Sequence, residues 1–184
     1  MDEVTRAALA AAQGQPHEIA VFVRLTQAEV WRVCARLVDQ QTADDLTQET
    51  YLRAFRALPR FGARSSARTW LLSIAHHTCM DELRRRTRTR DTLLTRQPDR
   101  DQPHPDVAEQ ATVNDLLRLL DPDRRAAFVL TQLFGLSYDD AAAICGCPTG
   151  TIRSRVARAR TDLIDALDAR QHTTDTTTRR RPSG

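Results

Sequence analysis

The sequence predicts an all-α protein made of two small helical domains that are joined by a flexible linker, the second domain containing a helix-turn-helix. Over most of the chain, apolar residues recur three and four positions apart, which is the periodicity of amphipathic helices. Aromatic residues make up only 5% of the composition, and runs of β-branched residues are scarce. A chain of 184 residues is long enough for one large core or two modest ones.

The first domain is expected to contain four helices. Gly14 should break the chain between the first two. Thr42 and Asp45 resemble a capping box at the start of the third helix, and Ser65 or Ser66 should cap the fourth. The domain is expected over residues 1–90, with helices near 3–13, 17–38, 43–58 and 67–86.

A linker is expected at residues 91–106, and the helical pattern already weakens after residue 86. This stretch contains Pro98, Pro103 and Pro105 among scattered charges. Helices should resume in a second domain at 107–170, near 107–120, 122–134, 137–145 and 149–169. The Thr-rich tail at 171–184 is expected to be disordered.

The third helix has one leucine on its polar face. At about 100° per residue, Leu52 falls beside charged residues, whereas Leu46 and Ala54 lie on the opposite side. A solvated helix with a Glu49–Arg53 pair explains this pattern, and so does a face that docks on another protein. The spacing alone favours the solvated helix. The other members of the polar face are Gln48 and Arg56.

The fourth helix is mostly apolar and should lie inside a bundle, but it carries one narrow polar strip. Trp70 and Met80 border the strip, and an arginine cluster follows it at 84–90. All 27 basic residues of the chain are arginine, although the net charge is only +3. The strip suits a nucleic-acid strand, but Asp81 and Arg84 could equally pair with each other. The strip consists of Ser73, His77, Asp81 and Arg84.

Residues 136–160 have the pattern of a helix-turn-helix. Ser137 should cap its first helix, Gly146 should end that helix in a left-handed conformation, and Pro148 follows. The second helix has an apolar stripe of Ile152, Val156, Ala159 and Leu163. Its outward face combines arginines with small residues, which favours DNA binding over a solvated basic surface. This face consists of Arg153, Ser154, Ala157, Arg158 and Thr161.

Together these blocks resemble a known family. Residues 44–58, Phe61, 68–75 and 136–160 are similar in order and spacing to bacterial RNA polymerase sigma factors of the sigma-70 superfamily. The resemblance is to the short extracytoplasmic-function (ECF) type and covers about residues 5–170. It implies a protein that binds core RNA polymerase, directs it to promoters with −10 and −35 elements, and promotes strand opening.

The resemblance also implies residue roles. The β′ clamp coiled coil of the polymerase would bind Asp45, Gln48, Glu49, Leu52 and Arg53. The −10 element would meet Phe61, Ser65, Trp70, Ser73, His77, Arg84 and Arg85. The −35 element would meet Thr151, Arg153, Ser154, Ala157 and Arg158. The β flap of the polymerase and an anti-sigma factor are further implied partners.

The chain departs from the family pattern at two of these positions. His77 stands where the family often has Asn to read a base, which leaves the −10 preference open. Because histidine titrates near neutral pH, that preference could depend weakly on pH. Ala157 stands where some relatives have an aromatic residue, so apolar contact with a thymine methyl would be reduced.

Other functions are less well supported. The chain has no phosphate-binding Gly loop, nucleophile triad or paired-carboxylate site, so no catalytic residue, no cofactor and no enzyme activity are expected. The rivals are a stand-alone helix-turn-helix regulator and a metal-dependent nuclease. The nuclease would use His76, His77, Asp81 and Glu82.

Neither metal binding nor membrane insertion is expected. Two candidate groups, His76 and His77 with Cys79, and Cys145 with Cys147, do not give four ligands at zinc-like spacing. No leader and no long apolar segment is present, so a cytoplasmic protein is expected, associated with the nucleoid when bound to polymerase. Its four cysteines should be reduced there.

Overall fold

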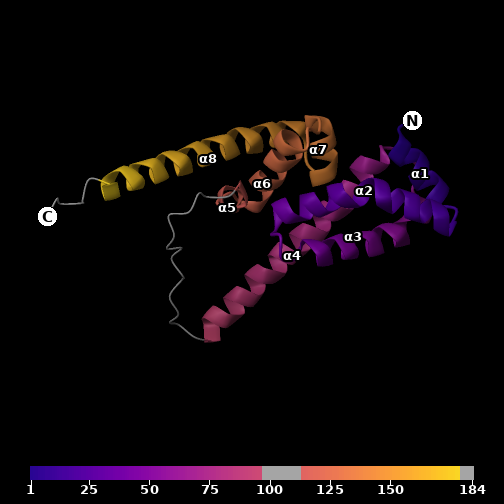
Figure 1. Ribbon diagram of the computed structural model, residues 1–184, viewed down its shortest axis with the longest axis horizontal. Coiled ribbons are helices and arrows are strands. Elements are labelled where there is room, and N and C mark those ends of the chain that lie inside the picture. The colour runs from indigo at the N-terminus through magenta and orange to yellow at the C-terminus, as the bar shows by residue number, and fades with distance from the viewer. Residues whose placement is uncertain (97–112, 179–184) are drawn as a thin grey trace.

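The computed structural model describes residues 1–96 and 113–178, with side chains described for 1–92 and 113–169. Every regular element in the described ranges is a helix, which confirms the predicted all-α fold (Figure 1). The predicted linker residues 97–106, the predicted helical residues 107–112 and the last six residues of the tail lie outside the described ranges.

The N-terminal unit is a bundle of four helices. As predicted, the chain breaks between the first two at Gly14, which has φ +80°. The core includes Phe22, Leu71 and Leu72. The helices are α1 (Glu3–Ala11), α2 (Pro16–Leu37), α3 (Ala43–Ala57) and α4 (Ala67–Arg96), with a 3₁₀ turn (Leu58–Arg60) after α3.

The two caps predicted in this unit have different outcomes. The Ser66 hydroxyl accepts a hydrogen bond from the Thr69 amide at 3.0 Å, which confirms Ser66 as the cap of α4. The predicted capping box at Thr42 is wrong, because the Thr42 side chain makes no cap hydrogen bond to α3. Instead, Asp39 accepts hydrogen bonds from the Thr42 amide and hydroxyl at 2.8 and 2.9 Å. The turn before α3 is therefore stabilised by Asp39.

Helix α4 is ten residues longer than predicted, so residues 87–96 are helical and the linker cannot begin at residue 91. No Gly or Pro interrupts the chain between Ala67 and Pro98. The hydroxyls of Thr87 and Thr89 donate to the carbonyls four residues earlier, each at 3.1 Å, so these residues satisfy their hydrogen bonds within the helix.

The C-terminal unit contains the predicted helix-turn-helix. The helix predicted at 122–134 is an α-helix that ends in a π-helical turn, in which the Phe134 amide donates to the Val129 carbonyl at 3.1 Å. The core of the C-terminal unit includes Leu130, Ile144 and Ile152. The elements are α5 (Val113–Arg118), α6 (Pro122–Phe128), the π-helical turn (Val129–Leu133), α7 (Tyr138–Cys145) and α8 (Thr149–Thr178).

The prediction that the tail is disordered from residue 171 is wrong for residues 171–178. Helix α8 continues through them to Thr178. No Gly or Pro follows Pro148 and Gly150 until Pro182, and elongating an existing helix is easier than nucleating a new one. Composition alone therefore placed the end of the helix too early.

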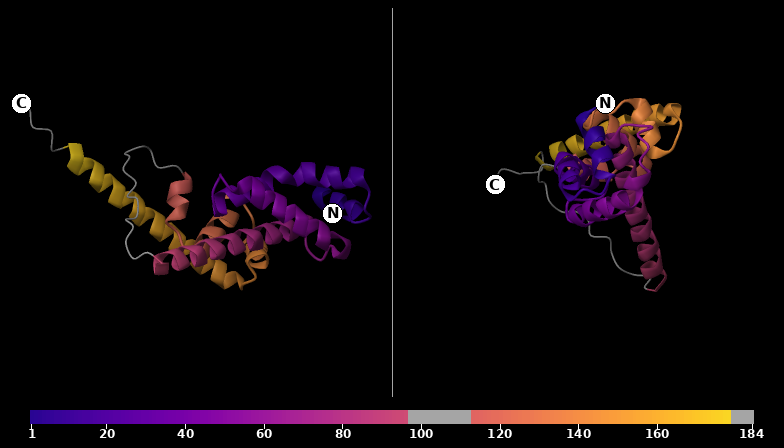
Figure 2. Two further views of the ribbon diagram at one scale, coloured as in Figure 1. Left: turned by 90° about the horizontal axis from the view of Figure 1, so that it is seen from below. Right: turned by 90° about the vertical axis from the view of Figure 1, so that its right-hand side faces the viewer.

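The two units pack side by side, with α2 and α4 of the first against α6 and α7 of the second. The Thr69 hydroxyl donates to Asp140 at 3.1 Å, and Arg68 donates to the Phe134 carbonyl at the same distance. The C-terminal parts of α4 and α8 project from the body of the molecule (Figure 1 and Figure 2). These two long helices diverge from each other as they leave the body (Figure 1).

Candidate polymerase- and DNA-binding surfaces

The outer face of α3 carries an exposed leucine. Leu46 and Ala54 on the inner face are buried, whereas the Leu52 residue is 48% exposed. Asp45 and Gln48 are exposed as well. The structure thus brings together the predicted polymerase-binding residues on one face, with an apolar side chain among polar ones.

Glu49 and Arg53 of this face are hydrogen-bonded to each other. Arg53 donates from Nε to Glu49 at 2.7 Å, so the predicted pair within the helix is present. The same guanidinium also donates to Asp81 of α4 at 2.8 Å. These hydrogen bonds, first that with Asp81 and then that with Glu49, raise the pKa of Arg53 above its usual range. Arg53 therefore connects α3 with α4, a contact that the sequence pattern did not reveal.

The polar strip of α4 lies at the surface and is held by contacts within the helix. His77 is exposed, and its Nδ1 lies 2.6 Å from the Ser73 carbonyl oxygen. The Ser73 hydroxyl donates to the Trp70 carbonyl at 2.6 Å. Arg84 donates to Asp81 at 3.2 Å, so the predicted alternative, a pair between these two residues, is present. That pair does not exclude nucleic-acid binding, because the Arg84 side chain is still 64% exposed.

The rings of Phe61 and Trp70 pack against each other in a tilted arrangement at the base of the loop that precedes α4. Their ring centroids are 4.9 Å apart. Phe61 is buried, whereas Trp70 is half-buried and Ser65 is exposed. Of the residues here that are predicted to meet the −10 element, Ser65 and Trp70 are thus accessible, and buried Phe61 packs against Trp70.

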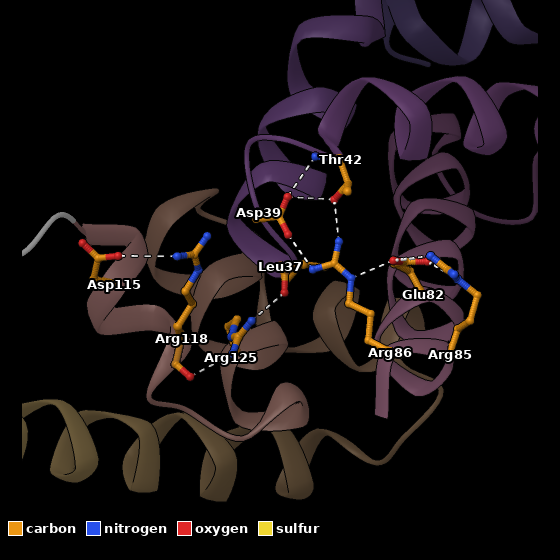
Figure 3. Close-up of polar contacts among 9 residues, drawn as sticks. All are labelled: Leu37, Asp39, Thr42, Glu82, Arg85, Arg86, Asp115, Arg118 and Arg125. Atoms are coloured by element: carbon orange, nitrogen blue, oxygen red, sulfur yellow. Dashed lines mark hydrogen bonds and ion pairs between the residues drawn. The ribbon is translucent and has the colours of Figure 1, made fainter. Parts of the chain in front are cut away.

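Two neighbouring arginines of α4 have different surroundings. Arg85 donates to Glu82 at 2.8 and 2.9 Å but stays exposed. Arg86 donates to Glu82 at 2.7 Å, to Asp39 at 2.5 Å and to Thr42 at 3.1 Å (Figure 3). Burial alone would raise the pKa of Asp39, but the hydrogen bonds from Arg86 and Thr42 outweigh it and lower that pKa. Arg86 thus ties α4 to the turn before α3.

The turn of the helix-turn-helix forms as predicted. The Ser137 hydroxyl accepts a hydrogen bond from the Asp140 amide at 3.0 Å, and Gly146 ends α7 with φ +63°. On α8 three members of the predicted apolar stripe, Ile152, Val156 and Ala159, are buried, and the fourth, Leu163, is half-buried. The expected packing of the second helix on the first is thereby confirmed.

The outward face of α8 presents fewer arginines to solvent than the helix contains. Arg153, Ser154, Ala157 and Arg158 are exposed, and Thr151 is half-buried. Two other arginines turn back to the protein: Arg155 contacts Asp123 and donates to the Cys147 sulfur at 3.6 Å, and Arg160 donates to Gln132 at 2.7 Å. Arg153 and Arg158 are therefore the cations of this face that point to solvent.

His76 is a buried residue whose environment the sequence did not indicate. Neither ring nitrogen has a hydrogen-bond partner among the described residues. Burial, with a smaller contribution from the charge of His77, lowers the pKa of His76 to about 4, while Asp123 acts in the opposite direction. The side chain is therefore neutral at physiological pH.

The cysteines and the acidic residues do not form a metal site in the part of the chain that the structure describes. No group of three or more His, Cys, Asp or Glu side chains there is placed to hold a metal ion. Cys34 and Cys79 are free thiols in the core, and burial raises the pKa of Cys145 to about 12. Among the described helices, none is long and apolar enough to cross a membrane.

Comparisons with known proteins agree with this geometry. The family profile described as Sigma-70 region 2 matches residues 22–89, and that of Sigma-70 region 4 matches residues 111–163. The chain is 52% identical over 167 residues to the ECF RNA polymerase sigma factor SigC of Mycobacterium tuberculosis, which covers 89% of this chain and 90% of that protein.

Solved structures agree as well. CnrH in complex with the cytosolic domain of CnrY has a TM-score of 0.70 at 27% identity, covering 91% of this chain and 99% of that one. The sigma factor RpoE in complex with the anti-sigma factor NepR from Bartonella quintana has a TM-score of 0.65 at 31% identity, covering 79% and 94%.

The fold and both matched regions define a sigma factor with region 2 in its N-terminal unit and region 4 in its C-terminal unit. The chain belongs to the ECF sigma factors of the sigma-70 superfamily. Its function is to direct RNA polymerase to promoters.

Proposed function

We propose that this sigma factor uses three separate surfaces to bind core RNA polymerase, the −10 element and the −35 element. The outer face of α3 docks on the β′ clamp coiled coil of core RNA polymerase. The strip of α4 with the loop before it captures the −10 element, and α8 reads the −35 element. Residues 1–90 supply the first two surfaces, and residues 107–170 supply the third and a contact with the β flap.

Leu52 is the observation that carries the docking proposal. A leucine that is 48% exposed among hydrogen-bonded polar residues gains little from its own fold and much from burial in an interface. Asp45, Gln48 and Glu49 form a polar rim around it, and Glu49 would face a cationic group on the clamp. Arg53, which is tied to Glu49 and Asp81, supports this rim.

The polar strip of α4 has the side chains needed to hold an unpaired DNA strand and so to promote strand opening. Exposed Arg84 and Arg85 offer guanidinium groups to phosphates, and half-buried Trp70 offers a ring to an unpaired base. Ser73 and His77 lie between Trp70 and Arg84 along α4, and their polar groups would face the bases of that strand. Capturing unpaired bases stabilises the melted state without any catalytic step. The sigma factor itself is accordingly proposed to act as a binding protein and to need no cofactor.

The −35 reading rests on four exposed side chains of α8. Arg153 and Arg158 suit guanine edges or phosphates, and Ser154 and Ala157 are small enough to let the helix approach the major groove. Thr151, half-buried near the start of α8, would contact the backbone of the same site. A fixed helix-turn-helix presents this face as a rigid unit.

An anti-sigma factor is a further candidate partner. Two similar structures are complexes: RpoE is bound to an anti-sigma factor, and CnrH is bound to the cytosolic domain of CnrY. A partner of this kind would compete with polymerase if it covered the Leu52 face. Its presence would act on the docking step before any contact with DNA.

Binding to core polymerase tests the docking surface. In gel filtration with core RNA polymerase, we expect wild type to co-elute and Leu52→Asp to elute alone with unchanged helical content. Leu25→Asp is the matched control, because Leu25 is an exposed leucine on α2 of the same unit. Co-elution of Leu52→Asp would contradict the proposal, and a loss of its helicity would show that Leu52 belongs to the core.

A further inference from the structure

Four charged side chains form a continuous chain across α3 and α4. Glu49 accepts a hydrogen bond from Arg53 at 2.7 Å, Arg53 donates to one oxygen of Asp81 at 2.8 Å, and Arg84 donates to the other oxygen at 3.2 Å. The series alternates in sign, with each inner member shared between two partners. A change at one end therefore alters how the next group is compensated.

The links in this chain differ in strength. Arg53 uses Nε for Glu49 and Nη1 for Asp81, and the contact with Arg53 is the main cause that lowers the pKa of Asp81. Arg84 makes the longest contact and has the most exposed side chain. Of the four groups, Arg84 is thus the most readily available to an anion from solution.

The two ends of this series of charged side chains lie on two surfaces of the N-terminal unit that are proposed to bind different partners. Glu49 belongs to the face of α3 around Leu52, and Arg84 belongs to the strip of α4. Asp81 connects these two surfaces, with one carboxylate oxygen on Arg53 and the other on Arg84. A coupling between these two faces rests on the function proposed for each of them.

We propose that Asp81 is a positioning residue that couples polymerase docking to capture of the −10 strand. In the free protein its carboxylate accepts a hydrogen bond from the Arg84 guanidinium, the group that would otherwise bind a DNA phosphate. When a cationic group of the polymerase pairs with Glu49, Arg53 loses its contact with Glu49 and hydrogen-bonds to Asp81 alone. Asp81 then holds Arg84 less strongly, and Arg84 becomes free for phosphate.

Strand affinity tests this coupling. The probe is a short fluorescent single-stranded oligonucleotide with the non-template −10 sequence of a promoter that the reconstituted holoenzyme transcribes. Its Kd is measured by anisotropy for the free protein and for the holoenzyme, with wild type, Asp81→Asn, Glu49→Gln and the double variant. Asp165→Asn removes the same charge from an exposed position on α8 and is the matched control.

Asp81→Asn should tighten strand binding by the free protein about two- to five-fold, the range expected for exposed ion pairs, and should tighten it less in the holoenzyme. Glu49→Gln should also tighten binding by the free protein, but only while Asp81 is present. This non-additivity is a readout that a merely structural role of Asp81 would not produce.

Four results would overturn the inference. Equal tightening by Asp165→Asn would assign the effect to net charge, and additive effects of Glu49→Gln and Asp81→Asn would separate the two residues. Weaker strand binding by Asp81→Asn would mean that Asp81 holds Arg84 in its DNA-binding position. A wild-type protein that fails to associate with core polymerase would refute the proposed function, and this inference with it.

Discussion

The guanidinium of Arg125, in region 4, donates a hydrogen bond at 2.8 Å to the carbonyl of Leu37, at the C-terminal end of α2 in region 2 (Figure 3). The same side chain donates to the carbonyls of Arg118 and Leu120, each at 3.2 Å. Arg125 is buried, and among the described residues no carboxylate accepts a hydrogen bond from it. A cation placed at the negative ends of α2 and α5 therefore holds the two regions together.

Arg125→Met should loosen the packing of region 2 on region 4. Three carbonyls lose a charged donor, and one such hydrogen bond is worth about 1.5–3 kcal/mol. We expect a larger radius of gyration in small-angle X-ray scattering. Arg124→Met is the matched control, because Arg124 pairs with Asp162 inside region 4. An unchanged radius for Arg125→Met would show that other contacts suffice to hold the regions together.

Replacing Arg158 by Ala should lower affinity for the −35 element by about 1–3 kcal/mol and relax preference at one base pair. The measurement is a comparison of Kd values across single-base variants of the element. Arg155→Ala should leave base preference unchanged, because Arg155 is engaged by Asp123 and Cys147. If Arg158→Ala weakened binding to all sequences equally, Arg158 would be a phosphate contact.

Arg85 and Arg86 are adjacent but should have different roles, Arg85 in DNA binding and Arg86 in the stability of the fold. Arg86→Gln should destabilise the fold by about 1–3 kcal/mol in urea unfolding, because half-exposed Arg86 closes the turn before α3 through Asp39. Arg85→Gln should leave unfolding unchanged and reduce the salt dependence of DNA binding by about one phosphate contact. The reverse result would place Arg86 on the DNA.

Stability should depend on pH through His76. The pKa of His76 is about 4 in the folded protein and about 6.5 in an unfolded chain, so the unfolded state binds more protons between these values. The free energy of unfolding should thus be constant above pH 6.5 and fall as pH drops from 6.5 to 4, by about 2 kcal/mol at pH 5. Urea titrations across this range measure the loss.

His76→Leu should flatten this dependence, because the variant has no imidazole to protonate. The window lies mostly above the range in which the carboxylates of Asp39, Asp81 and Glu82 take up protons, since the pKa of each is lowered. An equally steep dependence in His76→Leu would assign the effect to another group.

Local signals in the sequence predicted much of this molecule. Ser137 and Gly146 act within one turn of their own position, so the helix-turn-helix and its buried stripe could be read directly. The exposed face of Leu52 followed from the helical period in the same way. These features depend on neighbours a few residues away.

Features that depend on distant partners could not be predicted. Thr42 does not cap α3 because its hydroxyl donates a hydrogen bond to Asp39, and Arg155 contacts Asp123, which lies 32 residues earlier in the sequence. Nothing in the local pattern distinguished Arg125 from Arg124, although one joins two regions and the other stays within one. Helix ends at 96 and 178 were also missed, because composition suggested loops where no breaker residue stops the helix.

The most direct test of the whole account is run-off transcription. Purified protein is mixed with bacterial core RNA polymerase and the DNA upstream of its own gene, with wild type beside Leu52→Asp and Arg158→Ala. The account predicts start-specific transcripts from wild type alone. Transcripts of equal strength from Leu52→Asp would contradict the docking face on α3, and tight DNA binding by the protein alone without any transcript would contradict action through polymerase.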